Sequence, residues 1–179
     1  MYRLFIAIDL PDEVKDHLAN ICYGVQGARW VPKDQMHLTI RFLGDVDEPG
    51  YHAVSSCLSD VIASQFTIAL KGVGFFPPRN KPKLLWAGLE RNESLMELRR
   101  LIEARLRETG IEPEERKFAA HITLARLDER TPLHAITGFL SANGLFRVEP
   151  VVVEEFHLYS SILTKSGAVH SKEATYTLF

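Results

Sequence analysis

The stretch His37-Leu38-Thr39-Ile40 alternates polar and apolar residues, and the chain repeats this pattern at His121-Ile122-Thr123-Leu124. Successive side chains of a β-strand point to opposite faces, so each stretch sends His and Thr to one face and both apolar residues to the other. About half of the 179-residue chain separates the two histidines. We therefore predict two related halves, each contributing one His-bearing strand.

Regular elements are expected on both sides of the first motif. Apolar, β-prone residues predict a strand over 2–10, and Pro11 stands where a helix can begin. That helix has an apolar stripe, which consists of Val14, Leu18, Ile21 and Val25. The alternating segment 36–43 is a predicted strand that ends at the Gly44-Asp45 turn, and a second helix is expected over about 49–63.

The second half repeats this mixture of elements. Strands are predicted over 66–76 and 84–89, separated by a basic, proline-rich and rigid loop at 77–82. The clearest helix covers 93–109, and strand 118–127 carries the second motif. A short helix after Pro132, a β-rich stretch over 146–163, a turn near 166–167 and a last strand toward 179 complete the chain. We find no low-complexity linker, so we predict one domain over 1–179, with motifs at 37–40 and 121–124.

Composition narrows the function classes. Hydrophobic residues make up 46% of the chain, which is enough for a buried core and excludes a disordered protein. The 21 basic and 23 acidic residues give a net charge of −2, which argues against a long electrostatic footprint on nucleic acid but leaves room for a short nucleic-acid end. The two cysteines and the absence of a leader favour the cytoplasm. The apolar run 4–8 is too short to span a membrane.

The paired motifs indicate acid–base chemistry. Imidazole titrates near neutral pH, so two histidines facing one cleft can hold opposite protonation states. Opening a cyclic phosphodiester needs a base for the attacking water and an acid for the departing ribose oxygen. Thr39 and Thr123, on the same strand faces, would donate hydrogen bonds to the non-bridging oxygens.

Structural interpretations compete for each residue. A single His-x-Thr is common by chance, and threonine favours strands, so the case depends on the doubling of the motif. We interpret His17, His52 and His134 as surface residues. We favour structural roles for His157 and His170, with a place lining the cleft as the alternative. Because no His or Cys pair has the close spacing of zinc ligands, we expect neither a metal nor a cofactor.

Several segments together resemble the two-histidine (2H) phosphoesterases, and among them the bacterial and archaeal RNA 2',3'-cyclic phosphodiesterases, historically named 2'-5' RNA ligases. The resemblance covers nearly the whole chain and is carried by residues 3–8, 30–31, 37–44, 118–126 and 156–161. It implies a bilobal α+β fold with antiparallel sheets around a central cleft. It also implies metal-independent hydrolysis of a terminal 2',3'-cyclic phosphate to a 2'-phosphate.

The resemblance further assigns roles to residues. By this resemblance His37 donates a proton to the leaving 3'-oxygen, and His121 accepts one from water. The residues five places after each histidine, Phe42 and Arg126, would hold the terminal nucleobase. Strict alternation puts both on the opposite strand face, so each needs a bend or bulge to reach the cleft. We interpret Arg41 as an exposed charge or rim contact.

The sequence leaves several alternative functions open. The same residues would serve a 2'-5' RNA ligase or a 2'-5' phosphodiesterase acting on tRNA halves or oligoadenylate. A non-catalytic binder of RNA ends would keep the fold, and a small-molecule or protein-binding module has no motif in its favour. The expected partners are RNA 3' ends or small cyclic nucleotides, and the expected state is a monomer. A basic cluster around the proline-rich loop is either a path for RNA phosphates or a solvated face, and its members are Lys71, Arg79, Lys81 and Lys83.

Overall fold

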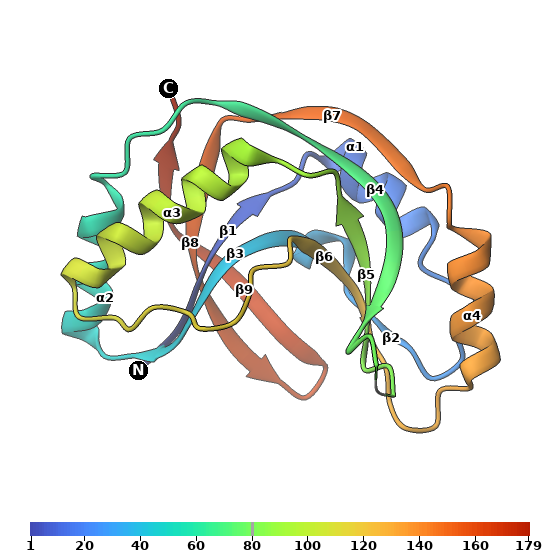
Figure 1. Cartoon of the computed structure of the whole chain (residues 1–179). Coiled ribbons are helices and arrows are strands. Elements are labelled where there is room, and N and C mark those ends of the chain that lie inside the picture. The colour runs from blue at the N-terminus through green and yellow to red at the C-terminus, as the bar shows by residue number, and fades with distance from the viewer. Residues whose placement is uncertain (80) are drawn as a thin grey trace.

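The computed structural model describes residues 1–79 and 81–179, and its described strands form one curved antiparallel sheet (Figure 1). Asn80, in the predicted loop, lies outside the described residues. The strands are β1 Tyr2–Asp9, β2 Arg29–Trp30, β3 His37–Val46, β4 Phe66–Phe76, β5 Leu84–Leu89, β6 His121–Arg126, β7 Arg147–Val153, β8 Glu155–Thr164 and β9 Gly167–Thr177.

The order of the strands divides the sheet into two matching halves. It runs β7-β4-β5-β6-β3-β1-β8-β9, with the short β2 paired to β6. Each half therefore has four strands in the main path, and the two His-bearing strands, β3 and β6, meet in the middle. The prediction of an α+β fold with antiparallel strands is confirmed.

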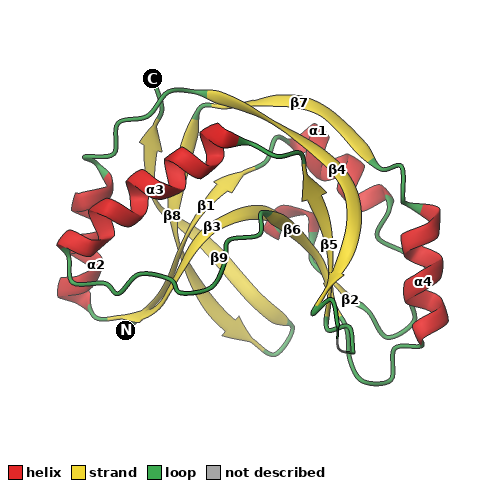
Figure 2. Ribbon diagram, viewed as in Figure 1, coloured by secondary structure: helices red, strands yellow, loops and turns green. Residues whose placement is uncertain are grey.

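Four α-helices and one 3₁₀ turn complete the described elements: α1 Asp12–Asn20, η1 Lys33–Gln35, α2 Glu48–Leu58, α3 Glu93–Glu108 and α4 Leu133–Ala142. Two of the helices begin with a side-chain cap, because Asp47 accepts the Gly50 N–H at 2.8 Å and Asn92 accepts the Leu95 N–H at 2.9 Å. In Figure 2, α2 and α3 lie together beside β1, β3 and β8, while α1 lies behind the upper part of β4 and α4 lies on the right, beyond β2.

The main core lies between the sheet and the helices. On β1, Leu4, Ile6 and Ile8 belong to this core, whereas Phe5 and Ala7 form a second small cluster with Tyr159 on the other face. Alternation along the strand thus gives β1 a packed face and a face directed toward the histidines. Among the described residues, no helix is long and apolar enough to cross a membrane.

Element boundaries differ from the predictions in four places. The strand expected to end at a Gly44-Asp45 turn continues to Val46, because Gly44 and Asp45 still pair with Leu4 and Arg3 of β1. The first helix ends at Asn20 although its apolar stripe continues, because the Ile21 N–H turns back to the Leu18 carbonyl at 3.2 Å and Val25 reaches the core from the following loop. The second helix ends at Leu58, and the backbone at Ala63 instead accepts a hydrogen bond from Phe179 at 2.9 Å. The strand predicted over 118–127 is shorter and begins only at His121.

Candidate active site

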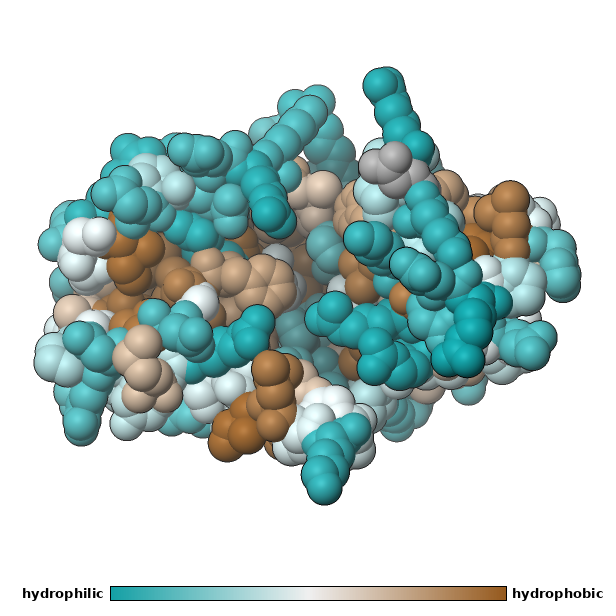
Figure 3. All heavy atoms as spheres, turned by 90° about the horizontal axis from the view of Figure 1, so that it is seen from below, coloured by the Kyte–Doolittle hydropathy of each residue, from teal (hydrophilic) through white to brown (hydrophobic). Residues whose placement is uncertain are grey.

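The two motifs are neighbours on adjacent strands. Strands β3 and β6 pair antiparallel with Leu38 opposite Ile122. His37 therefore flanks Thr123, and Thr39 flanks His121, on the face opposite the two buried apolar residues. Diagonal neighbours in such a pair have Cα atoms about 7–8 Å apart, which allows both imidazoles to reach one tetrahedral anion. Figure 3 views the molecule from the concave side and shows a hollow near the centre, bordered by hydrophilic side chains.

Both imidazoles are oriented in the same way. His37 Nδ1 lies 2.8 Å from the carbonyl oxygen of Gln35, and His121 Nδ1 lies 2.7 Å from the carbonyl oxygen of Ala119. A carbonyl oxygen only accepts hydrogen bonds, so Nδ1 carries the proton in each ring. The Nε2 atom of each ring is then the one available to exchange protons with a substrate.

The surroundings of the two rings differ. His37 lies among other aromatic rings, with centroid distances of 4.9 Å to Phe5 and 5.2 Å to the edge-on ring of His170. Burial lowers the pKa of His37 to about 4, although the hydrogen bond to the Gln35 carbonyl opposes that decrease. His121 contacts the ring of Phe76 edge-on at 5.0 Å.

A β-bulge returns Phe42 to the face of the histidines. The pairing of β1 with β3 runs from Ala7↔Thr39 to Ile6↔Arg41, so Ile40 is an extra residue. Ile40 and Arg41 are consequently both buried, and alternation restarts with Phe42 on the exposed side. The Phe42 side chain is 63% exposed, and its ring lies 5.8 Å from that of Phe5.

Strand β6 carries the matching bulge. Its pairing with β5 runs from Trp86↔Thr123 to Leu85↔Ala125, which leaves Leu124 as the extra residue. Leu124 and Ala125 are both buried, and Arg126 is exposed. The bulge that Phe42 and Arg126 each needed is therefore present at the corresponding position of both motifs.

The prediction for Arg41 is wrong. The residue is 8% exposed, and its guanidinium forms an ion pair with Glu103 of α3 at 2.8 Å. It also donates to the carbonyl oxygens of Phe42 at 2.8 Å and Glu112 at 2.5 Å. The bulge turns the Arg41 side chain toward α3, so that it can pair with Glu103 and donate to the Glu112 carbonyl. Sequence alternation alone gives no sign of that reversal.

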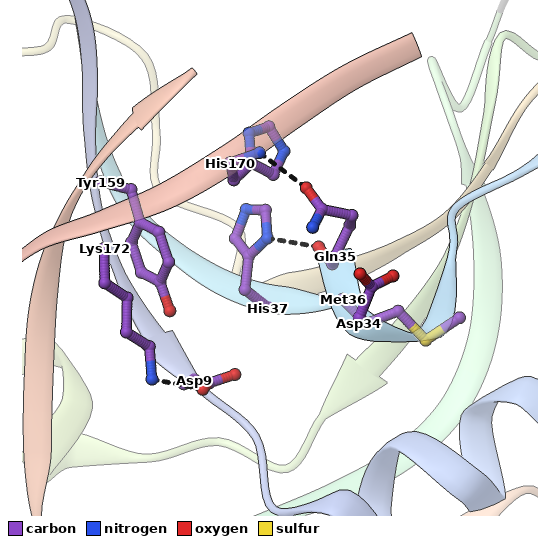
Figure 4. Close-up of a pocket in the computed structure, with 8 residues that line it drawn as sticks. All are labelled: Asp9, Asp34, Gln35, Met36, His37, Tyr159, His170 and Lys172. Atoms are coloured by element: carbon purple, nitrogen blue, oxygen red, sulfur yellow. Dashed lines mark hydrogen bonds and ion pairs between the residues drawn. The ribbon is translucent and has the colours of Figure 1, made fainter. Parts of the chain in front are cut away.

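A pocket of about 130 Å³ lies beside His37 (Figure 4). Its lining residues are Asp9, Asp34, Gln35, Met36, His37, Tyr159, His170 and Lys172.

The structural role expected of His157 agrees with its burial and its 2.9 Å contact to the Thr175 hydroxyl. A structural role was favoured for His170 as well, but it lies in this pocket, in agreement with the alternative that it lines the cleft. The available signal was its spacing of two residues from Lys172, which puts both on one face of β9.

Charged side chains in and beside the pocket form ion pairs with one another. Asp9 pairs with Lys172 at 2.7 Å and with Lys15 at 2.9 Å. Burial alone would raise the pKa of the Asp9 carboxyl, but the two ammonium groups outweigh it and hold that pKa below its usual value. Across the described part of the chain, no group of three or more His, Cys, Asp and Glu side chains is arranged to hold a metal ion.

Comparison with protein families identifies the same internal repeat. The model for LigT-like phosphoesterases matches the chain twice, over residues 8–86 and 88–170, so each match contains one of the two motifs. The resemblance and the predicted duplication are thus supported over most of the sequence.

Named relatives and solved structures agree with this match. An RNA 2',3'-cyclic phosphodiesterase of Archaeoglobus fulgidus is 31% identical and covers 94% of this chain and 96% of its own, and that of Thermotoga maritima is 33% identical with 94% and 91% coverage. The crystal structure of Escherichia coli LigT with 3'-AMP has a TM-score of 0.78 at 25% identity, covering 99% of this chain and 98% of its own. A Thermus thermophilus structure also has a TM-score of 0.78, at 30% identity, with 98% and 97% coverage.

Proposed function

Because the chain belongs to the LigT-like phosphoesterase family, we propose that it hydrolyses terminal 2',3'-cyclic phosphates of RNA to 2'-phosphomonoesters. The names of its relatives support the substrate class. The observation that carries the proposal is the pairing of Leu38 with Ile122, which brings both His-x-Thr motifs to one face. The chain would act as a single bilobal domain, as a monomer in the cytoplasm, on RNA 3' ends or small cyclic nucleotides.

In the proposed reaction, Nε2 of His121 takes a proton from water while the water oxygen attacks phosphorus. The bond between phosphorus and the ribose 3'-oxygen breaks in line with that attack, and Nε2 of His37 donates a proton to the departing oxygen. The phosphate stays on the 2'-oxygen. The hydroxyls of Thr39 and Thr123 donate to the non-bridging oxygens as negative charge gathers on them.

His37 must be protonated to act as the acid, whereas burial keeps it neutral at pH 7 in the free protein. The negative charge of the bound phosphate favours the protonated form of His37. One negative charge about 4 Å from the ring, at an effective dielectric constant of about 20, stabilises the imidazolium by about 4 kcal/mol. That energy raises the pKa of His37 from about 4 toward neutral pH. His37 would therefore become charged when substrate binds.

Phe42 and Arg126 would hold the terminal nucleobase. The two bulges turn them to the face of the histidines, from opposite ends of the paired motifs. A nucleobase offers two flat faces, one for the Phe42 ring and one for the planar guanidinium of Arg126. The LigT structure with 3'-AMP shows that a relative accepts a mononucleotide.

A short RNA ending in a 2',3'-cyclic phosphate tests the proposal. The protein should open the ring and leave the phosphate on the 2'-oxygen, with and without chelator. His37→Ala and His121→Ala should each lower turnover by about 10²- to 10⁴-fold, whereas the exposed control His134→Ala should match the unmodified protein. Full turnover by both single variants, or a 3'-phosphate product, would refute the mechanism. Incubation with tRNA halves and with 2'-5' oligoadenylate tests the ligase and 2'-5' phosphodiesterase alternatives.

A further inference from the structure

The pocket beside His37 lies where an RNA strand would continue. In the proposed function, on which this inference rests, His37 faces the leaving 3'-oxygen. The ribose that carries this oxygen, and the chain extending from its 5' side, must then lie on the His37 side of phosphorus. Figure 4 shows His37 standing inside this pocket, between Tyr159 and Lys172 on one side and Gln35 and Asp34 on the other.

One polar atom in the pocket lacks a partner. His170 Nδ1 is buried and has no hydrogen-bond partner among the described residues. The backbone of the same residue is held firmly, because its N–H donates to Oε1 of Gln35 at 2.7 Å. Leaving a buried polar atom unpaired costs about 1–3 kcal/mol, so a bound group that satisfies it would be favoured. Burial and the charge of Arg126 lower the pKa of His170, so the ring is neutral and can donate through an Nδ1–H.

The charges favour an anion at one end of the pocket. Asp9 has two ammonium partners, so this trio carries a net positive charge. The Lys172 side chain is 43% exposed and lines the pocket, whereas that of Lys15 is only 10% exposed and does not. Asp34 provides a carboxylate among the other lining residues, where a ribose hydroxyl could donate a hydrogen bond. A sugar–phosphate unit carries both kinds of group.

We propose that this pocket is the subsite for the nucleotide that precedes the cyclic phosphate. His170 and Lys172 bind the phosphodiester that joins it to the terminal nucleotide. The natural substrate is then an RNA of at least two nucleotides, and a mononucleoside cyclic phosphate uses only part of the site. A charge-assisted hydrogen bond contributes about 1.5–3 kcal/mol, which corresponds to about a 10- to 100-fold preference for the longer substrate.

The test compares kcat/KM for adenosine 2',3'-cyclic phosphate with kcat/KM for the adenylyl dinucleotide ending in the same group. The protein should prefer the dinucleotide by at least about tenfold. Lys172→Met should bring this ratio close to one. Lys15→Met is the matched control, because it also removes one ammonium partner of Asp9 but lies outside the pocket, so it should reduce the preference less than Lys172→Met does.

His170 is tested by two replacements. His170→Phe keeps a flat ring against His37 but lacks the donor, so it should reduce the dinucleotide preference. His170→Asn can present an amide N–H near the position of Nδ1, so it should recover part of that preference. For an RNA oligonucleotide, Lys172→Met should also lower the slope of log affinity against log salt by about one, which a purely structural defect would not do.

The outcomes separate the two proposals. If neither substrate is hydrolysed, the proposed function fails. If both are hydrolysed with equal kcat/KM, or if Lys15→Met and Lys172→Met reduce the preference alike, the function stands and the subsite is refuted.

Discussion

Acid should destabilise this protein through His37, and replacing that residue should remove much of the effect. The ring is buried against Phe5 and near Tyr159 and His170, where a positive charge is poorly solvated. Its pKa is consequently about 4 in the folded protein, compared with 6.5 for an unperturbed histidine. Between these two pH values the unfolded chain binds a proton at His37 that the folded chain does not. Stability is therefore fully present above pH 6.5 and is lost as the pH falls toward 4.

The magnitude follows from the two pKa values. At pH 4.5 the unfolded His37 is almost entirely protonated and the folded His37 mostly neutral. Integrating the difference in bound protons from pH 7 to pH 4.5 gives a loss of about 2.5 kcal/mol in the free energy of unfolding. The ring is partly accessible to solvent, so this figure is an upper bound.

Urea denaturation at pH 7 and pH 4.5 measures this loss for the unmodified protein and for His37→Asn. Each protein is compared with itself, so the packing lost in the variant cancels. His157 and His170, whose pKa values burial also lowers, remain in both proteins and cancel as well. The variant should lose about 2 kcal/mol less than the unmodified protein. Equal losses in the two proteins would refute the reasoning that burial keeps His37 neutral.

Three further predictions concern the stability of variants at Arg41 and Gly74 and the pH dependence of activity. Arg41→Met should lower the free energy of unfolding by about 1.5–3 kcal/mol, measured by urea denaturation, because it removes the 2.8 Å partner of the largely buried Glu103 and leaves it only Arg99 at 3.7 Å; a loss below about 1 kcal/mol would contradict this role. Gly74→Ala should cost about 1–3 kcal/mol in the same assay, because the new Cβ would lie 2.2 Å from Cζ2 of Trp86, and an unchanged stability would show that the ring moves freely. The plot of kcat/KM against pH should fall on the alkaline side of about pH 4, the pKa of His37 in the free protein, because His37 must be protonated to act as the acid, and the alkaline limb of kcat should lie at higher pH because bound phosphate favours the charged ring; identical alkaline limbs would contradict charging by the substrate.

Local pattern predicted much of this structure. Alternation at His37-Leu38-Thr39-Ile40 correctly assigned the faces of that strand, because one face packs on the core and any slip in register would bury the histidine. The repeat at His121 predicted a second related half, and the two family matches agree with it. The resemblance to the 2H phosphoesterases supplied the fold class, which the pattern alone left open.

The remaining features depend on contacts between distant segments. The bulges at Ile40 and Leu124 are properties of strand pairing, so alternation within one strand assigned Arg41 to the wrong side. Arg41 is buried because Glu103, in α3, lies opposite it. His170 reaches His37 only through the β8–β9 hairpin and its hydrogen bond to Gln35, which is 135 residues away in sequence.

The most direct test of the paired-histidine site is a crystal structure with a nucleoside vanadate, whose five-coordinate vanadium imitates phosphorus during attack. The account predicts that Nε2 of His37 and Nε2 of His121 lie within hydrogen-bond distance, about 2.6–3.2 Å, of the two apical oxygens on opposite sides of the metal. Contact with only one of the two rings, or with both on the same side, would contradict it.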